Sequence, residues 1–429
     1  MLGLILGLGL LMFLAYKGMS IIWIAPICAL VVAVFGGLPL LPTYTTTYMD
    51  GFVGFTRSWF PIFMLGAIFG KIMEETGMAQ AVAHWFVQIL GKQRAILAVV
   101  VGCAILTYGG VSLFVVVFAM YPLALALFRE ANISRKLIPG CIALGSFTFT
   151  MTALPGTPQI QNLIPMEFFK TPATAAPIMG IAAGIVLMVG GYLYMIWKEK
   201  RLTAAGEVFT EGKGAPKSVD ASKLPNTLLS FVPIIVVPAT LNLPFLKFPP
   251  ILALLSGIVV AIALNPGILK KLVATINAGA NASLIAIINT SAAVGFGMVV
   301  RAVPAFKTLT DALMDLGGNP LISLSLAVNA LAGATGSASG GLGIALRALG
   351  AEYLALAQAT GLNPEALHRI ASLSSGGLDT LPHNGAVLTL LAVTGLTHQD
   401  SYFDIFVVSL LMPVLATVVA IVLASMGLV

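Results

Sequence analysis

The sequence predicts an all-α polytopic membrane protein, and three observations support this fold class. Of its 429 residues, 59% are hydrophobic and only 9% are charged, whereas about 25% of the residues of a soluble domain are charged. The two halves of the chain also share one pattern of helix-breaking residues. Most of the chain lies in uncharged runs longer than the roughly 20 residues that a membrane span needs, namely 18–49, 95–128, 137–166, 171–197, 272–300, 316–346 and 405–429.

A single offset of 227 residues superposes the two halves without a gap. Leu154-Pro155 then falls on Leu381-Pro382, and Ser112 falls on Ser339. Such self-similarity is typical of a duplicated structural unit. We therefore predict a first repeat (1–197), a polar linker (198–227) and a second repeat (228–429).

Each repeat is predicted to hold five spans, one of them broken, and a re-entrant hairpin. In the first repeat, 2–16, 19–38 and 58–76 are the initial spans, and 77–90 is an amphipathic helix in the membrane interface. The next run, 95–128, is too long for one span and carries Thr107-Tyr108-Gly109-Gly110-Val111-Ser112 at its middle, which favours a hairpin that turns inside the membrane. A span broken at 152–158 and an unbroken span, 174–197, complete the unit.

Five spans per unit require consecutive repeats to insert in opposite orientations. The side that faces the linker would then collect 15 of the 22 Lys and Arg residues, so by the positive-inside rule the linker is cytoplasmic and both termini lie outside. We read the net charge of +6 as topology and not as nucleic-acid binding. Inverted repeats are typical of transporters whose site lies at the repeat interface near the midplane.

Four segments at predicted membrane depth break the helical pattern: 107–112, 152–158, 333–341 and 379–385. Unwound backbone is tolerated there only where protein, a ligand or a water-filled cavity surrounds it. Helix N-termini, glycines and polar side chains in these segments would suit a small carboxylate that bears hydroxyls, and none of the segments holds Lys or Arg. The candidate substrate-binding residues are Tyr108, Gly109, Gly110, Ser112, Gly156, Thr157, Gln159, Ser337, Ser339, Gly340, His383 and Asn384.

Asp379 and His383 are ionisable residues at membrane depth, which makes them functional candidates by default. One of them would carry the proton, and His383 would also donate to the substrate. The alternative is structural: Asp379 caps the following half-helix and His383 bonds a carbonyl. Asp379, Thr152 and Thr380 are the candidate ion-coupling residues, and hydroxyl groups around the same loops leave sodium coupling open beside proton coupling.

Several other features are expected to be structural. Gly336-x4-Gly341 lacks the Lys and Ser/Thr of a nucleotide-binding loop. Asn289-Thr290-Ser291 faces either a neighbouring helix or the site, and we expect it to bond a neighbouring helix. His368, beside Arg369, is expected at the outer surface. We expect no cofactor and no metal centre, since the three cysteines lack ligand spacing.

Two motifs, SSGGLDTLPHNGAVLTLLAVTGLTH (374–398) and FTMTALPGTPQIQN (149–162), resemble those of the gluconate permease family, bacterial proton symporters of small hydroxy acids. Within it, the chain looks most similar to the hydroxybutyrate branch. The resemblance implies an elevator-type transport domain, homodimerisation through scaffold domains, and a site around Ser112, Ser339, Gly156-Thr157 and His383-Asn384.

The predicted function is therefore proton-coupled symport of a small hydroxy or keto monocarboxylate across a bacterial inner membrane, with no enzymatic activity. The partners are the carboxylate, the proton or sodium ion, and the lipid bilayer. One alternative is a sodium-coupled dicarboxylate symporter of the same superfamily. Others are an intramembrane enzyme that uses Asp379 and His383 as acid and base, and a passive channel.

Overall fold

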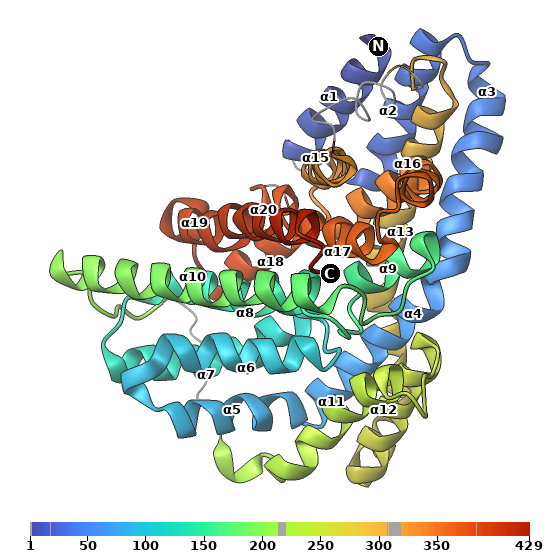
Figure 1. The fold of residues 1–429 in the computed structure, drawn as a ribbon. Coiled ribbons are helices and arrows are strands. Elements are labelled where there is room, and N and C mark those ends of the chain that lie inside the picture. The colour runs from blue at the N-terminus through green and yellow to red at the C-terminus, as the bar shows by residue number, and fades with distance from the viewer. Residues whose placement is uncertain (1, 18, 213–219, 307, 309–318, 383) are drawn as a thin grey trace.

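The computed structural model describes residues 2–17, 19–212, 220–306, 308, 319–382 and 384–429. These residues form helices and no strand (Figure 1). The helices of the first half are α1 (Leu2–Tyr16), α2 (Ile21–Gly36), α3 (Leu40–Pro42), α4 (Met49–Glu75), α5 (Met78–Leu90), α6 (Ala95–Tyr108), α7 (Leu113–Ala131), α8 (Ile138–Ser146), α9 (Ile160–Phe169) and α10 (Pro177–Ala204).

The second half repeats this series of helices in the same order. Shifting α6, α8 or α9 by 227 residues lands within two residues of the bounds of α15, α17 or α18, and the counterpart of α5 would fall mainly outside the described residues. The helices of this half are α11 (Thr227–Asn242), α12 (Pro250–Leu264), α13 (Leu272–Ala302), α15 (Pro320–Thr335), α16 (Ala338–Thr360), α17 (Pro364–Ser375), α18 (Gly385–Thr394), α19 (His398–Phe406) and α20 (Met412–Ser425).

Five described helical stretches are long and apolar enough to cross a membrane: Leu40–Glu75, Pro177–Ala204, Leu272–Ala302, Ala338–Thr360 and His398–Ser425. A sixth span results if α5 and the helix that follows it, which are bent by 100°, count as one. The prediction of an all-α polytopic membrane protein is therefore confirmed. The inverted orientation of the two halves stays a prediction.

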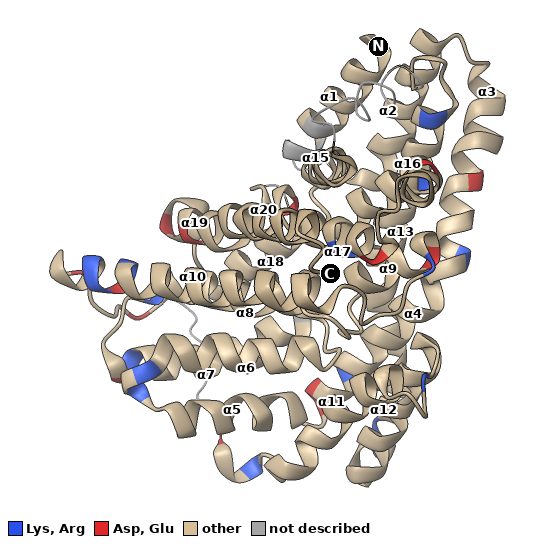
Figure 2. Ribbon diagram, viewed as in Figure 1, with Lys and Arg blue, Asp and Glu red and all other residues tan. Residues whose placement is uncertain are grey.

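The helices form two groups that pack against each other. In one group α13 crosses α4 in the most extensive contact between two helices and also packs on α2, while α12 contacts α4 and α11. In the other group α6 packs against α5, α7 and α8, and α10 packs on α20 (Figure 1). Charged residues lie mainly at helix ends and in connecting segments, with Lys and Arg gathered where α7 and α10 end (Figure 2).

Each half contains a hairpin and a broken helix. The turns of the two hairpins are Gly109–Ser112, between α6 and α7, and Gly336-Ser337, between α15 and α16. One broken helix runs from α8 through a π-helical turn, Phe149–Ala153, and irregular chain to α9. The other runs from α17 through a 3₁₀ turn, Leu378–Thr380, to α18. The predicted breaks thus coincide with real interruptions of helical structure.

One predicted boundary was wrong. The third span is not limited to 58–76, because α3, a π-helical turn at Thr43–Tyr48 and α4 form one continuous stretch of 36 residues. The first residues of the predicted polar linker are helical, since α10 continues to Ala204, and the bounds of the linker stay a prediction. Arg201 in the last turn of α10 interacts favourably with the negative end of the helix dipole, which explains how a charged segment stays helical.

Gly341 allows the two arms of the second hairpin to approach closely, since a Cβ at this position would overlap the backbone N and Cα of Ala332. We expect Gly341→Ala to destabilise the protein by about 1 to 3 kcal/mol through overpacking, measured as a lower melting temperature in detergent. Gly9→Ala is the control, because nothing lies within 4 Å of its added Cβ. Equal melting temperatures for the two variants would contradict close packing of the hairpin.

Candidate functional site

The four helix breaks converge on one cavity of about 1100 Å³. Each hairpin turn and each broken helix contributes lining residues, and α4 and α13 form the opposite wall. Seven of the predicted site residues line the cavity: Gly110, Ser112, Gln159, Ser337, Ser339, Asp379 and Asn384. Segments separated by more than 200 residues in sequence therefore meet at one place.

In the first half, side chains tie the broken helix to the hairpin turn. Gln159 Nε2 donates to the carbonyl of Thr107 at 2.6 Å and to that of Val111 at 3.5 Å, and the Tyr108 hydroxyl donates to the carbonyl of Pro155 at 2.9 Å. The carbonyls of Val111 and Pro155 gain partners where the helices are interrupted, and the carbonyl of Thr107, which also accepts from the N–H of Gly110, gains a second one. The first hairpin turn and the first break therefore hold each other in place.

In the second half, Asn384 performs the same task. Its Nδ2 donates to the carbonyl of Gly336 at 3.0 Å and to that of Asp379 at 2.9 Å. Its Oδ1 accepts from the N–H groups of Ala386 and Val387, so Asn384 is the N-cap of α18. The N-terminus of this half-helix was predicted to suit a carboxylate, but the Asn384 side chain already occupies two of its N–H groups.

Hydroxyl groups cluster at the second hairpin turn. Ser337 Oγ accepts from the N–H of Gly340 at 3.1 Å and lies 3.5 Å from Ser339 Oγ. Ser339 Oγ also lies 3.4 Å from Thr290 Oγ1 on α13. Because these last two contacts are long, the Ser339 hydroxyl can readily exchange them for a stronger partner in the cavity.

Asp379 lines the cavity with a side chain that is 4% exposed. Its Oδ1 is buried and has no hydrogen-bond partner among the described residues. The interpretation of Asp379 as the cap of the second half-helix is wrong, because Asn384 caps α18. A buried carboxylate oxygen without a partner is costly, so Asp379 is suited to binding a proton or a ligand.

The other predicted residues that the structure describes do not line the cavity. Tyr108, Gly109, Gly156, Thr157 and Gly340 lie next to lining residues, where Gly156 adopts the left-handed conformation (φ 81°) and its carbonyl accepts from Asn242. A Cβ on Gly109 would overlap the side chain of Ile234. His383 lies outside the described residues.

The side chains of Thr152 and Thr380 bond other parts of the protein and not the cavity. Thr152 Oγ1 donates to the carbonyl of Thr148 within its own π-helical turn, and Thr380 Oγ1 donates to the carbonyl of Ser409 at 3.0 Å. In this conformation both threonines stabilise the broken helices from behind the cavity wall. Their assignment to ion coupling stays a prediction.

Sequence reasoning gave a position at the site only as the alternative for the polar triplet of α13. Asn289 and Thr290 line the cavity, and the buried Oδ1 of Asn289 has no hydrogen-bond partner among the described residues. Ser291 bonds Thr56 on α4 at 2.8 Å and Thr290 lies 3.4 Å from Ser339 on α16, so the expected bonds to neighbouring helices occur at these two positions. The signal in the sequence was the run of three polar residues in an uncharged helix, but helical periodicity alone could not tell which faced the site.

The prediction that His368 lies at the outer surface was wrong, because the side chains of His368 and of the neighbouring Arg369 are fully buried. Arg369 donates to Asn162 Oδ1 at 3.0 Å and to the carbonyl of Ala175 at 2.6 Å. His368 contacts Thr171 Oγ1 at 2.7 Å and Asn162 Oδ1 at 3.1 Å. The polar network formed by these residues joins the two broken helices behind the cavity.

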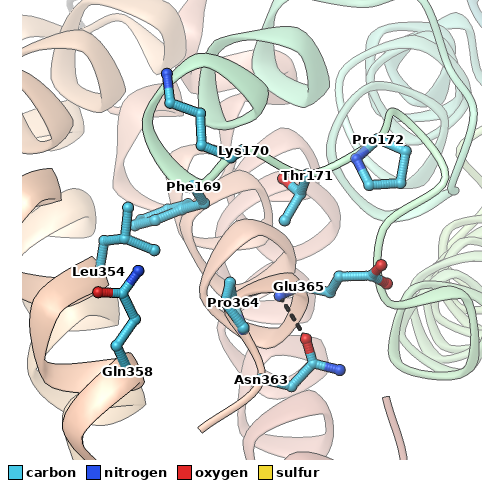
Figure 3. A pocket seen from close by; sticks show the side chains of 9 residues that line it. All are labelled: Phe169, Lys170, Thr171, Pro172, Leu354, Gln358, Asn363, Pro364 and Glu365. Atoms are coloured by element: carbon cyan, nitrogen blue, oxygen red, sulfur yellow. Dashed lines mark hydrogen bonds between the residues drawn. The ribbon is translucent and has the colours of Figure 1, made fainter.

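A second pocket of about 360 Å³ lies where the loop after α9 meets the loop between α16 and α17 (Figure 3). Lys170, Gln358 and Asn363 supply part of its polar lining. The carboxylate of Glu365 extends toward the loop that follows Pro172, where it accepts from the N–H of Ala176 at 2.8 Å. Polar groups in this pocket bond neighbouring loops, so the larger cavity is the better candidate for a functional site.

Comparisons with known proteins agree with this arrangement. The family model described as GntP family permease matches residues 1–245. An uncharacterized transporter, YxjC of Bacillus subtilis, is 44% identical, with 95% of each chain covered. An uncharacterized permease of Haemophilus influenzae is 26% identical over 75% of this chain and 71% of its own.

The crystal structure of the Alcanivorax borkumensis YdaH transporter, whose title reports an unusual topology, is similar in fold. The alignment has a TM-score of 0.57 and 16% sequence identity, and it covers 90% of this chain and 88% of the other. At this identity the similarity concerns the fold alone.

Asn384→Ala removes both the cap of α18 and the tie to the second hairpin turn. We expect it to lower the free energy of unfolding by about 2 to 3 kcal/mol and to speed hydrogen exchange at the first turn of α18. Asn226→Ala is the control, since Asn226 caps α11 through Leu229 and should cost only about 1 kcal/mol. Equal losses of unfolding free energy in Asn384→Ala and Asn226→Ala would show that the hydrogen bond from Asn384 to the carbonyl of Gly336 contributes nothing to stability.

Proposed function

Because the chain belongs to the GntP permease family and is a multi-pass membrane transporter, we propose that it carries a small hydroxy or keto monocarboxylate by proton-coupled symport. The observation that carries this proposal is the convergence of four backbone breaks on one cavity. Such breaks are stable at membrane depth only around a cavity or ligand. A transporter uses them to offer backbone and side-chain hydrogen bonds to a solute that must leave water.

The donors around the cavity favour a small anion. Hydroxyl groups of Ser112, Ser337 and Ser339 and the amide of Asn289 are available to it, whereas the amide N–H groups of Gln159 already bond backbone carbonyls. Each can bond a carboxylate oxygen or a hydroxyl of the solute. No Lys or Arg occurs in the four breaks, which favours one carboxylate over two. This lining supports a gluconate-like or 3-hydroxybutyrate-like substrate.

Asp379 is the proposed proton carrier. It is a carboxylate of the cavity wall, and its buried Oδ1 lacks a partner among the described residues. A protonated Asp379 would no longer repel the substrate carboxylate and could donate a hydrogen bond to it. Binding of the proton and of the anion would then support each other, which is the basis of coupling.

We further propose that the protein lies in a bacterial inner membrane, with a cytoplasmic linker and outside termini. The cavity extends along the second half of α4 to Lys71 and Glu74 and along the first half of α13 to Ala278. These are the ends predicted to face the cytoplasm, so this conformation would be open inward. An elevator-type movement of the broken helices and hairpins, in a homodimer, would open the other side.

Sodium coupling with a dicarboxylate is the second candidate, because the hydroxyls of Ser337, Ser339 and Thr290 lie close together. Hard cations take oxygen ligands of this kind. Membership of a permease family favours transport over the intramembrane enzyme.

Uptake into proteoliposomes tests the proposal. Labelled 3-hydroxybutyrate and gluconate are offered to the purified protein under an imposed inward proton gradient or an inward sodium gradient. Accumulation of either acid driven by the proton gradient alone is the expected result. Accumulation that requires sodium would indicate that the coupling ion is sodium, bound by the hydroxyls of Ser337, Ser339 and Thr290. Flux without uphill accumulation would identify a channel.

We expect Asp379→Asn to abolish proton-driven accumulation while it retains exchange of labelled for unlabelled substrate, because an amide cannot take up the proton. The measurement compares uphill uptake with exchange in the same liposomes. Asp404→Asn is the matched control: Asp404 is also a buried carboxylate, but it bonds Tyr194 and Lys198 outside the cavity. Uphill uptake by Asp379→Asn at the wild-type level would remove Asp379 from coupling.

Ser339→Ala should raise the half-saturation concentration about threefold to tenfold, the loss expected for one neutral hydrogen bond to the substrate. Initial uptake rates over a range of substrate concentrations give this value. Ser230→Ala is the control, because Ser230 is buried on α11 and its hydroxyl bonds only the carbonyl of Asn226 in the preceding turn. An unchanged half-saturation concentration in Ser339→Ala would exclude the Ser339 hydroxyl from the site.

A further inference from the structure

Three charged side chains are buried among the described residues: Arg369, Asp379 and Asp404. Asp404 has a cationic partner, because Lys198 Nζ lies 3.5 Å from its Oδ1. Arg369 and Asp379 have no ion-pair partner within 4 Å among the described residues. They have opposite charges and lie on the two sides of the break that follows α17.

Arg369 bonds residues of the first broken helix that directly adjoin cavity-lining residues in the sequence. Its guanidinium donates to Asn162 Oδ1, to the carbonyl of Ala175 and, at 3.4 Å, to that of Thr152. Asn162 directly follows Gln161, which lines the cavity, and Met151, which precedes Thr152, lines it too. These partners are neutral, so they orient the guanidinium without cancelling its charge.

The neighbours of Arg369 do not supply the missing negative charge inside the core. Both amide N–H groups of Asn162 donate to carbonyls, of Thr157 and Ala173, so its Oδ1 accepts from His368 Nε2. A neutral His368 with the proton on Nε2 then satisfies both of its contacts.

Glu365 lies one turn from Arg369 on α17, but its side chain is at the rim of the small pocket (Figure 3). It is partly exposed and its carboxylate accepts from the N–H of Ala176. Water and this bond stabilise the Glu365 charge at the surface, whereas Arg369 is completely buried. The Glu365 carboxylate does act electrostatically on Arg369, but from the surface, where water screens it. The charge of Arg369 is therefore only partly compensated in the interior unless Asp379 or a bound anion adds to the balance.

We propose that Arg369 is the fixed counter-charge of the transport site, an inference that rests on the proposed proton-coupled carriage of a monocarboxylate. The charges of Arg369, Asp379 and the substrate then add up to zero in two states only. In the empty state an ionised Asp379 balances Arg369. In the loaded state the substrate carboxylate balances Arg369, and Asp379 has taken up the proton.

The other two states are charged. A bound anion with an ionised Asp379 leaves one negative charge, and an empty site with a protonated Asp379 leaves one positive charge. An uncompensated charge is strongly disfavoured in the low-dielectric interior of a membrane protein, so these states change conformation slowly. One proton then moves with each carboxylate, and the net movement is electroneutral. Arg369 does not touch the substrate: it is a positioning residue that acts through charge.

The test uses the full-length protein in proteoliposomes with labelled 3-hydroxybutyrate as the probe. For the wild type, initial uptake in a proton gradient should change less than twofold when valinomycin imposes a potassium diffusion potential of either sign. Exchange of the labelled acid should be at least tenfold slower in Arg369→Gln and Arg369→Met, because their loaded site is net negative. The residual transport of these variants should gain sensitivity to the potential.

Two further variants separate charge from structure. Arg369→Lys loses the forked hydrogen bonds but keeps the charge, and should retain exchange within about threefold of the wild type. Arg301→Gln removes a partly exposed arginine that pairs with Glu352, and should leave exchange unchanged. Melting temperatures and binding of the acid in detergent show that each variant is folded.

The outcomes are distinguishable. Two results would contradict the role of Arg369 as counter-charge but not the proposed symport. One is a loss of exchange in Arg369→Lys as large as that in Arg369→Gln. The other is wild-type uptake whose rate depends on the membrane potential. A wild type that carries neither 3-hydroxybutyrate nor gluconate would overturn the proposed function, and the inference with it.

Discussion

The structure depends on satisfying backbone groups where helices are interrupted inside a membrane. A membrane interior offers no water to an unpaired carbonyl, so each break needs a polar side chain from a facing segment. Gln159 bonds the carbonyl of Thr107, Tyr108 that of Pro155, and Asn384 that of Gly336. Because every break uses a partner on another segment, the hairpins and broken helices can be stable only when they meet. The cavity lies where they meet.

The two halves solve this problem with different chemistry. In the first half, Gln159 occupies the N-cap position of α9, but its side chain bonds the hairpin turn and leaves the helix uncapped. In the second half, Asn384 caps α18 and bonds the turn with the same side chain. A solute in the cavity therefore finds an open helix N-terminus on one side and a capped one on the other. The duplicated backbone thus produces a site that is not symmetric.

The sequence predicted well what depends on local residues. The hairpin turn at Gly109–Ser112 and the breaks before Asn384 and Gln159 follow from glycine, proline and polar residues in uncharged runs. Each of these sequence signals indicates where a helix ends, and it does so independently of the segments that pack against that helix. The predicted start of the third span, at residue 58, was wrong. A π-helical turn at Thr43–Tyr48 joins α3 to α4, so the helical stretch begins well before that residue.

What the sequence could not predict are the positions that depend on partners far along the chain. His368 and Arg369 are polar residues that normally lie in water. Their burial is explained by hydrogen bonds to Asn162, Thr171 and Ala175, which lie about 200 residues earlier in the chain. The contribution of Asn289 to the cavity likewise depends on how α13 is rotated against the second hairpin. No periodicity within one helix contains that information.

In the proposed symport mechanism, the duplication also separates binding of the substrate from balance of its charge. Hydroxyl groups for a substrate occur in both halves at equivalent positions, since Ser112 corresponds to Ser339. The buried charges occur in one half only, because the counterparts of Arg369 and Asp379 are Ile142 and Thr152. A ligand held between two similar turns can be passed to either side of a membrane, which requires two matching halves. In this mechanism, balancing one anion with one proton requires one titrating group, Asp379, and one fixed charge, Arg369. A second copy of these two residues in the first half would add charges that a monocarboxylate could not balance.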